Sequence, residues 1–247
     1  KINMPLRETD WLEKNINKVK IIDCSWHMPQ TNRDGFKEYK KRHIENAIFF
    51  DLDENSKKNT HLPHMLVEID VWEKIVSKMG ITNDDEIIIY DNSDVISSCR
   101  CWFNFIYFGH DPKLVHVLNG GLTKWVDERR KVTDETRKVK ISNYKSFEKI
   151  DLNKTKKLID QNIDKQIFKV IDARSLERFK GQVQEPRKGL RSGNIKNSMC
   201  IPFQNCLNKN KTFKNKDELI AVFKTCLKNL NEKNIVFSCG SGVTACV

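Results

Sequence analysis

The sequence predicts an α/β protein made of two copies of one domain, each a parallel sheet flanked by helices. Its 247 residues are enough for one large domain or two medium ones. Short β-branched runs show little alternation, which is typical of strands buried on both faces, and helical stretches separate them. Similar motifs recur at an offset of about 150 residues. Together these observations favour a parallel α/β sheet in each half.

Three motifs of the first half reappear in the second half in the same order. The matched pairs are residues 19–23 with 168–172, residues 42–48 with 193–199, and residues 86–91 with 233–239. The third pair sets Asp91 beside Cys239. Any one match is weak, but three matches in order at nearly one offset indicate a duplicated domain.

The pattern predicts a first domain over 1–130, a linker over 131–150 and a second domain over 151–247. The linker is rich in Lys, Thr and Ser and has no strong apolar period. Helices are expected over 70–79, 101–108 and 217–230, and strands over 19–23, 86–91, 113–118, 168–172 and 235–238. The first copy continues past Asp91 for longer than the second continues past Cys239. We therefore expect the second domain to be truncated at its C-terminus.

Composition and spacing argue against several kinds of partner. The net charge is +11, but the basic residues are mostly Lys and are scattered, so no nucleic-acid partner is expected. No apolar run approaches the roughly 20 residues of a membrane helix, so no membrane partner is expected. The eight cysteines lack zinc-finger spacing, so no metal is expected. Mostly reduced cysteines would suit a cytoplasmic location.

Residues 239–244, Cys-Gly-Ser-Gly-Val-Thr, carry the strongest sign of chemistry. They directly follow the predicted strand 235–238, and ligands of open α/β sheets bind at the carboxyl ends of strands. Two glycines let the backbone direct N–H groups inward, where they stabilise an anion. Such a loop would favour the thiolate of Cys239, the reactive form of cysteine. The usual alternative, a buried inert thiol, is expected for Cys200 and Cys226.

The loop, the duplication and the Asn119-Gly120-Gly121 element resemble the tandem-domain rhodaneses, and the loop resembles their 3-mercaptopyruvate sulfurtransferase branch. The resemblance covers essentially the whole chain. It implies two tandem rhodanese-like domains, of which only the second carries the catalytic cysteine, Cys239. Asp91 then stands where the first domain has lost its cysteine. The resemblance also assigns substrate contacts to the rest of the loop, namely Gly240, Gly242, Val243 and Thr244.

Two further segments resemble functional motifs of that family. Residues 51–53 and 62–66 resemble the stretch that supplies an Asp and a His to a proton relay with the loop serine. The relay would consist of Asp53, His64 and Ser241; this chain has Val67 where the family usually has proline. Residues 177–187 resemble the segment whose two arginines bind the substrate carboxylate and carbonyl. These would be Arg178 and Arg187.

The resemblance implies a sulfurtransferase that takes sulfur from the small-molecule donor 3-mercaptopyruvate as a persulfide on Cys239 and releases pyruvate. A thiol such as thioredoxin or glutathione, or cyanide, would then accept the sulfur, and no cofactor would be needed. The closest alternative is thiosulfate sulfurtransferase, whose loop has basic residues where this chain has Gly240, Ser241 and Gly242. A cysteine-dependent phosphatase is a further alternative, but its chemistry would need an arginine six positions beyond the cysteine, where this chain has Ala245. A non-catalytic redox or binding module is the remaining alternative.

Overall fold

The computed structural model describes residues 4–247, which form two compact units. The first unit runs to Ile150 and includes Asn210–Thr212. The second unit holds Asp151–Lys209 and Phe213–Val247. Within the described part of the chain, no helix has the length and apolar character needed to span a membrane.

The first unit is an α/β structure with a five-stranded parallel sheet. Its strands are β1 (Leu6–Arg7), β2 (Lys20–Asp23), β3 (His43–Ile44), β4 (Ala47–Phe49), β5 (Ile87–Tyr90), β6 (Val115–Leu118) and β7 (Val132–Thr133). Its helices are α1 (Thr9–Asn15), α2 (Gly35–Lys41), α3 (Ile69–Lys78), α4 (Ser98–Tyr107) and α5 (Gly121–Asp127), with a 3₁₀ turn η1 (Pro29–Thr31). The strand order is β1-β6-β5-β2-β4, and all neighbours in this sheet are parallel. This confirms the predicted fold class.

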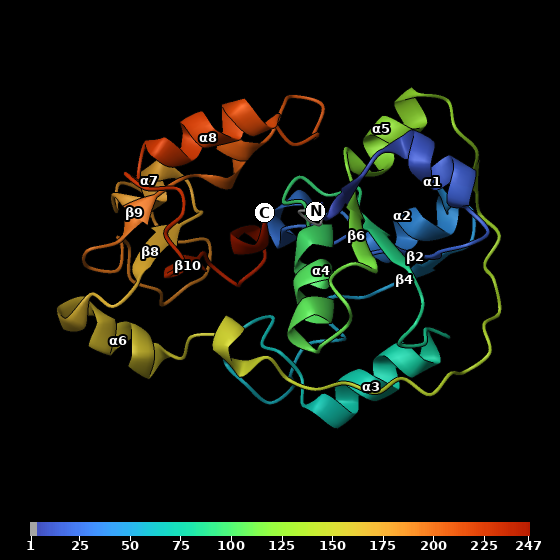
Figure 1. The fold of residues 1–247 in the computed structure, drawn as a ribbon, viewed down its shortest axis with the longest axis horizontal. Helices are drawn as coiled ribbons and strands as arrows, with labels where there is room; N and C mark the ends of the chain where they lie inside the picture. The colour runs from blue at the N-terminus through green and yellow to red at the C-terminus, as the bar shows by residue number, and fades with distance from the viewer. Residues whose placement is uncertain (1–3) are drawn as a thin grey trace. The chain divides into compact units, whose positions relative to one another are not determined.

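Both faces of the large sheet are covered, which explains the near-continuous apolar strands. On one face, Ile21 and Ile88 pack with Leu12 of α1, Tyr39 of α2 and Trp125 of α5. Figure 1 shows α4 across the sheet from α1 and α2. Because successive strand side chains point to opposite faces, a strand covered on both faces needs apolar residues at every position.

Gly120 and Gly121 form a turn that requires glycine. Both have positive φ values, 88° and 56°. A Cβ atom on Gly121 would lie 2.5 Å from the carbonyl oxygen of Asp91, closer than real Cβ contacts come. That same oxygen accepts the main-chain N–H of Leu122 at 2.9 Å. The turn therefore brings the start of α5 against the end of β5.

Residues 131–150, expected as a linker, belong to the first unit and pack against its other residues over part of their length. Strand β7 pairs antiparallel with β3. Tyr144 is fully buried, and its hydroxyl contacts Nδ1 of His110 at 3.0 Å. The sequence pattern shows no period here because the segment lies in an extended form and contacts the unit at isolated residues.

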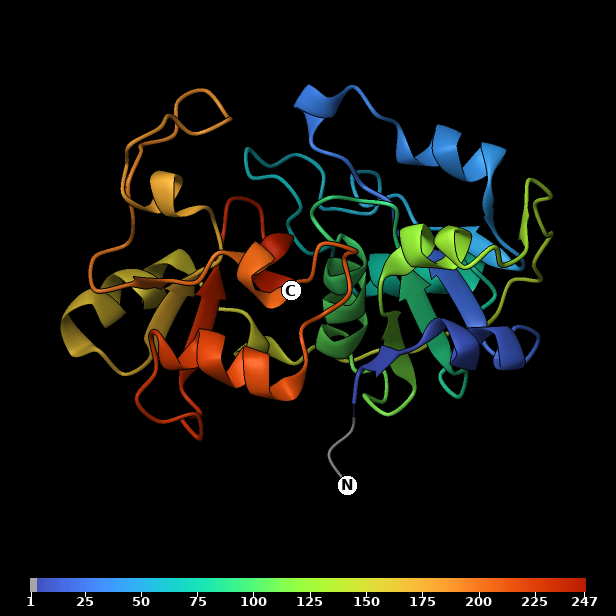
Figure 2. The ribbon, with the colours of Figure 1, turned by 90° about the horizontal axis from the view of Figure 1, so that it is seen from above.

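The second unit contains a smaller parallel sheet. Its strands are β8 (Lys169–Asp172), β9 (Met199–Cys200) and β10 (Ile235–Ser238), in the order β10-β8-β9. Its helices are α6 (Lys156–Lys165), α7 (Leu176–Phe179) and α8 (Lys216–Lys224), with 3₁₀ turns η2 (Ile150–Leu152), η3 (Phe203–Cys206) and η4 (Thr244–Cys246). Figure 2 shows β10 in red, with α8 in orange along one side of the sheet. Val222 and Phe223 of α8 pack against a core containing Ile171.

The helix predicted over 217–230 ends earlier than expected. Helix α8 stops at Lys224, where the hydroxyl of Thr225 bonds back to the carbonyl oxygen of Val222 at 2.6 Å. Asn229 then accepts the N–H of Asn231 with its side chain, which holds a turn in place of a further helical turn. Of the apolar residues that extended the pattern, Leu227 packs in the core of the second unit, whereas Leu230 is exposed.

Candidate active site

The cysteine loop begins where strand β10 ends. Cys239 follows Ser238, and its Sγ atom accepts the main-chain N–H of Gly242 at 3.1 Å. Gly242 has a φ of 73°, a left-handed conformation that glycine adopts without side-chain strain. The 3₁₀ turn Thr244–Cys246 follows. The loop therefore curls back and directs a main-chain N–H at the sulfur.

A cavity of about 210 Å³ lies beside Cys239 within the second unit. Strands β8 and β10 are parallel neighbours, so their carboxyl ends meet at one edge of the sheet, and Ser238 pairs with Asp172 there. The cavity is smaller than the roughly 300–1,000 Å³ typical of drug-sized ligand sites, so it suits a ligand of few atoms. It is lined by Asp172, Arg174, Arg191, Ser192, Gly193, Asn194, Ile195, Ser238 and Cys239.

Arg174 links three parts of the cavity wall. Its Nη2 atom donates to Asp172 Oδ2 at 2.6 Å and to the carbonyl oxygen of Gly193 at 2.7 Å. Its Nη1 atom donates to Glu185 Oε1 at 2.9 Å. The side chains of all three charged residues are at least nine-tenths buried. Arg174 therefore ties the loop that carries Glu185 and Gly193 to the end of β8.

The two arginines predicted to bind substrate both lie against the cysteine loop. Nη1 of Arg187 donates to the carbonyl oxygen of Gly240 at 3.2 Å. A Cβ atom on Gly240 would lie 3.1 Å from Nη2 of Arg178, so the absence of a side chain leaves room for this guanidinium. Arg178 also forms a two-bond pair with Glu185: its Nε donates to Oε1 at 3.0 Å and its Nη2 donates to Oε2 at 2.5 Å. That hydrogen bond from Arg178 is the main reason that the pKa of Glu185 is lowered.

Sequence analysis did not assign a role to Arg174 or Arg191. The signal for Arg174 was its position two residues after Asp172, the acid that ends a buried strand. The main-chain N–H of Arg174 also donates to Asp172 Oδ1 at 2.9 Å, which forms a turn closed by the aspartate side chain. No sequence signal distinguished Arg191 from the surrounding exposed basic residues.

Asp53 and His64, both predicted relay residues, are paired within the first unit. Nε2 of His64 lies 2.8 Å from Oδ1 of Asp53. The other carboxylate oxygen of Asp53 accepts the indole N–H of Trp26 at 3.0 Å. Nδ1 of His64 is buried and meets no hydrogen-bond partner among the described residues. The pKa of Asp53 is lowered, chiefly by its hydrogen bond to His64.

The remaining predicted loop residues lie in the second unit. Val243 is buried, whereas Ser241 and Thr244 are partly exposed. Their contacts with substrate, and the joint role of Ser241 with Asp53 and His64, stay predictions. In residues 4–247, no cluster of three or more His, Cys, Asp or Glu side chains could hold a metal ion.

The sequence pattern of the rhodanese-like domain matches residues 8–128 of this chain. The chain is also 37% identical over 266 residues to thiosulfate/3-mercaptopyruvate sulfurtransferase 1, mitochondrial, of Arabidopsis thaliana. That alignment covers 98% of this chain and 69% of the plant protein. This chain belongs to the rhodanese family.

Two further relatives of this rhodanese are named for different sulfur donors. This chain is 34% identical to the 3-mercaptopyruvate sulfurtransferase of Mus musculus, over 92% of this chain and 76% of the mouse protein. It is also 34% identical to the thiosulfate sulfurtransferase of Bos taurus, over 98% of this chain and 83% of the bovine protein. The crystal structure of SseA from Escherichia coli matches with a TM-score of 0.87 and 27% identity, covering 98% of this chain and 91% of SseA. The chain is thus a sulfur-transferring enzyme with tandem rhodanese-like domains.

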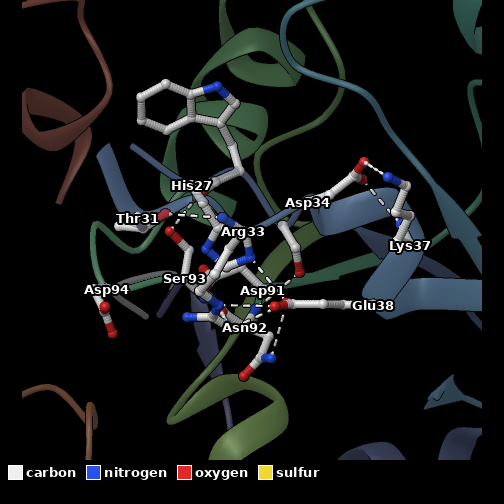
Figure 3. A network of polar contacts seen from close by, with 12 residues as sticks. His27, Thr31, Arg33, Asp34, Lys37, Glu38, Asp91, Asn92, Ser93 and Asp94 are labelled. Atoms are coloured by element: carbon white, nitrogen blue, oxygen red, sulfur yellow. Dashed lines mark hydrogen bonds and ion pairs between the residues drawn. The ribbon is translucent and has the colours of Figure 1, made fainter. Parts of the chain in front are cut away.

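The first rhodanese unit has an aspartate where the second has its cysteine. Asp91 follows β5, and its two carboxylate oxygens accept the main-chain N–H groups of Ser93 and Ser98, both at 2.9 Å. Burial raises the pKa of Asp91. Figure 3 shows Asn92, the residue between Asp91 and Ser93, beside Glu38 of α2, to which its side-chain amide donates at 3.3 Å. The N–H groups of this loop therefore bind the chain's own carboxylate.

Proposed function

We propose that this rhodanese moves sulfur from 3-mercaptopyruvate, through a persulfide on Cys239, to a thiol or cyanide acceptor and releases pyruvate. The observation that carries the proposal is the position of Cys239: its sulfur accepts a main-chain N–H at the carboxyl end of β10, beside a cavity for a small ligand. Arg178 and Arg187 lie against the same loop. The guanidinium fork matches the planar carboxylate of the donor.

In the proposed reaction, the Cys239 thiolate attacks the thiol sulfur of 3-mercaptopyruvate. A sulfur–sulfur bond forms as the carbon–sulfur bond breaks, and the electron pair leaves on carbon as pyruvate enolate. The enolate then takes a proton to give pyruvate. Ser241, His64 and Asp53 would carry this proton from the donor thiol. Nδ1 of His64, which has no hydrogen-bond partner among the described residues, would accept it by way of the Ser241 hydroxyl, and the relay would then return it to the enolate carbon. The main chain of residues 240–244 would hold the negative charge.

We also propose a sulfur acceptor and a cellular compartment for this protein. A thiol such as thioredoxin or glutathione, or cyanide, would attack the outer persulfide sulfur and regenerate the Cys239 thiolate. The sulfur is carried on the protein itself, so the proposed cycle uses no metal or organic cofactor. Free thiols are expected to persist in a reducing compartment such as the cytoplasm.

A persulfide on Cys239 is the direct test of this proposal. The protein is incubated with 3-mercaptopyruvate without acceptor, and intact and peptide masses are measured. We expect the mass of one added sulfur atom, located on Cys239, with release of pyruvate and loss of the added mass on addition of cyanide. Cys239→Ser should gain no sulfur, whereas Cys206→Ala, a change at a buried thiol elsewhere in the second unit, should behave as the native protein. A native protein that gains no sulfur would instead support the non-catalytic module.

Thiosulfate is the second candidate donor, and two arginines of the cavity wall, Arg174 and Arg191, favour it because thiosulfate is a dianion. Arg174 is already paired with Asp172 and Glu185, however, and residues 240–242 provide no cationic side chain. We therefore expect kcat/KM for 3-mercaptopyruvate to exceed that for thiosulfate at least tenfold, or about 1.4 kcal/mol of transition-state binding. Steady-state assays with both donors and cyanide measure the ratio. An equal or reversed ratio would favour thiosulfate sulfurtransferase.

Arg187→Ala is expected to weaken donor binding without changing the nucleophile. Loss of one hydrogen bond to a charged group costs about 1.5–3 kcal/mol, so kcat/KM for 3-mercaptopyruvate should fall roughly 10–100-fold. Alkylation of Cys239 by neutral iodoacetamide should keep its native rate. Lys188→Ala removes the adjacent exposed cation and serves as the matched control. If alkylation fell together with turnover, Arg187 would act on the thiol and not on the donor.

A further inference from the structure

Trp26 contacts both members of the Asp53–His64 pair. Its indole N–H donates to Asp53 Oδ2 at 3.0 Å, while His64 Nε2 lies 2.8 Å from Asp53 Oδ1. The rings of Trp26 and His64 meet edge to face, with centroids 4.8 Å apart and planes at 90°. Each carboxylate oxygen of Asp53 is therefore assigned to a different partner.

Without Trp26, little would fix the orientation of the Asp53 carboxylate. The side chain of Asp53 is 66% exposed, whereas that of His64 is 3% exposed. Nδ1 of His64 has no partner among the described residues, so Asp53 is the contact by which hydrogen bonding orients the ring. If the carboxylate turned away, neither the orientation of the His64 ring nor its tautomer would be fixed.

Trp26 is itself held by the loop that replaces the cysteine loop in the first unit. The hydroxyl of Ser97 accepts the main-chain N–H of Trp26 at 3.1 Å and donates to the carbonyl oxygen of Cys24 at 2.6 Å. The hydroxyl of Ser93 donates to the carbonyl oxygen of Trp26 at 2.5 Å. Both serines are completely buried. The loop therefore fixes the backbone of Trp26 from both sides.

The same loop is organised by Asp91, whose carboxylate binds the N–H groups of Ser93 and Ser98. A continuous series of hydrogen bonds thus leads from Asp91 through Ser93 to Trp26 and on to Asp53 and His64. In the second unit, the matching position holds Cys239, the proposed nucleophile. In the first loop, the carboxylate of Asp91 occupies the N–H groups of Ser93 and Ser98, and the loop supports Trp26.

We propose that Trp26 is a positioning residue, which orients the Asp53 carboxylate so that His64 is held in the Nε2–H tautomer, and that residues 91–98 serve as its support. The proposal rests on the proposed function in one respect, because it takes the Asp53–His64 pair as the proton relay. The tautomer leaves Nδ1 as the bare nitrogen. That atom is then available to take a proton from a hydroxyl.

Charged side chains contact the main chain of both residues of the pair. Lys58 donates to the carbonyl oxygen of Asp53 at 3.3 Å and is paired with Glu54. Arg100, from α4, donates to the carbonyl oxygen of His64. The hydrogen bond from Trp26 is one of the contacts that lower the pKa of Asp53, after the hydrogen bond to His64. Its removal should raise that pKa, and the acidic limb of the pH profile should move to higher pH.

Trp26→Phe removes the N–H donor and keeps an aromatic ring beside His64. We expect kcat with 3-mercaptopyruvate to fall roughly tenfold, part of the factor of a hundred or more that a positioned acid–base group supplies, with KM changed much less. Nitrogen-15 NMR of the imidazole should show one tautomer of His64 in the native protein and a mixture in the variant. Trp11→Phe is the matched control, since Trp11 also meets a histidine, His116, edge to face.

A second variant isolates the N–H donor from the shape of the ring. Benzothienylalanine at position 26 replaces the indole N–H by sulfur and should reproduce the tautomer mixture and the shifted acidic limb. If both position-26 variants kept the native tautomer and the native pH profile, the positioning role of Trp26 would be wrong. If the native protein formed no persulfide, the proposed function would fail, and the NMR comparison would still decide whether Trp26 orients the pair.

Discussion

Arg174→Ala is expected to destabilise the second unit by about 3–5 kcal/mol, the range measured when one partner of a buried ion pair is removed. Arg174 is the hydrogen-bond donor to Asp172 and shares Glu185 with Arg178. Its removal would leave the buried carboxylate of Asp172 without its cation and would free the carbonyl oxygen of Gly193. A buried charge left without its partner costs more than the pair itself contributed.

The two units can be followed separately in this experiment. All five tryptophans lie in the first unit, so tryptophan fluorescence in urea reports on that unit. Hydrogen exchange measured by mass spectrometry reports on the second unit through the amides of β8 and β10. We expect Arg174→Ala to speed exchange in these strands by at least a hundredfold while the fluorescence transition stays close to native. Arg191→Ala, at an exposed arginine of the same cavity, should leave both signals within the ±0.5 kcal/mol typical of surface changes.

Native exchange rates in β8 and β10 of Arg174→Ala would contradict this account. They would mean that the buried carboxylate of Asp172 loses its partner at little cost. Arg174→Lys gives an intermediate test, because a lysine supplies one point charge but not the planar fork that reaches Asp172, Glu185 and Gly193 together. We expect it to recover part of the stability and to widen the loop around Gly193.

The sheets could be predicted from sequence because strands buried on both faces are apolar at every position. Strand β5 is buried at all four positions, and the α/β class is confirmed. Residues 235–238 form β10 with the predicted bounds, although this strand is only partly buried and Phe237 is 44% exposed. Strand β1 could not be predicted, because Leu6–Arg7 is too short to show a period and forms only by pairing with β6. The end of α8 depended on side-chain bonds of Thr225 and Asn229 that no apolar pattern records.

The candidate site could be predicted only in part. The glycine spacing after a predicted apolar strand indicated Cys239, and the resemblance to rhodaneses indicated the arginines and the histidine. Trp26 could not be found in this way, because its contact joins residues that are 27 positions apart through a single indole N–H. Arg174 was missed because its second charge partner, Glu185, becomes a neighbour only when the loop folds.

The first unit should lose stability as the pH rises from about 4 to about 7, because of Asp23. Asp23 ends β2 and is 1% exposed. Burial raises its pKa from 3.8 to about 7, although Ser25 donates to Oδ1 from its N–H at 2.9 Å and from its hydroxyl at 2.6 Å. Between these two values the folded state keeps a proton that the unfolded state has lost, so stability falls with pH.

Asp23→Asn removes this titration while leaving an oxygen to accept the bonds from Ser25. The difference in unfolding free energy between variant and native protein should grow in favour of the variant from pH 4 to pH 8, by on the order of 4 kcal/mol. Urea unfolding followed by tryptophan fluorescence measures this difference in the first unit. Asp127→Asn makes the same change at an exposed carboxylate of α5 and is the matched control.

Asp172 occupies the matching position in the second unit, but its partner is different. Asp23 and Asp172 each end a central strand and accept the N–H of the residue two positions later, Ser25 and Arg174, at 2.9 Å. Ser25 offers no positive charge, and Asp91 nearby raises the pKa of Asp23 further, whereas Arg174 neutralises Asp172. A difference between Asp23→Asn and native protein that stayed constant from pH 4 to pH 8 would show that Asp23 is ionised in the folded state despite its burial.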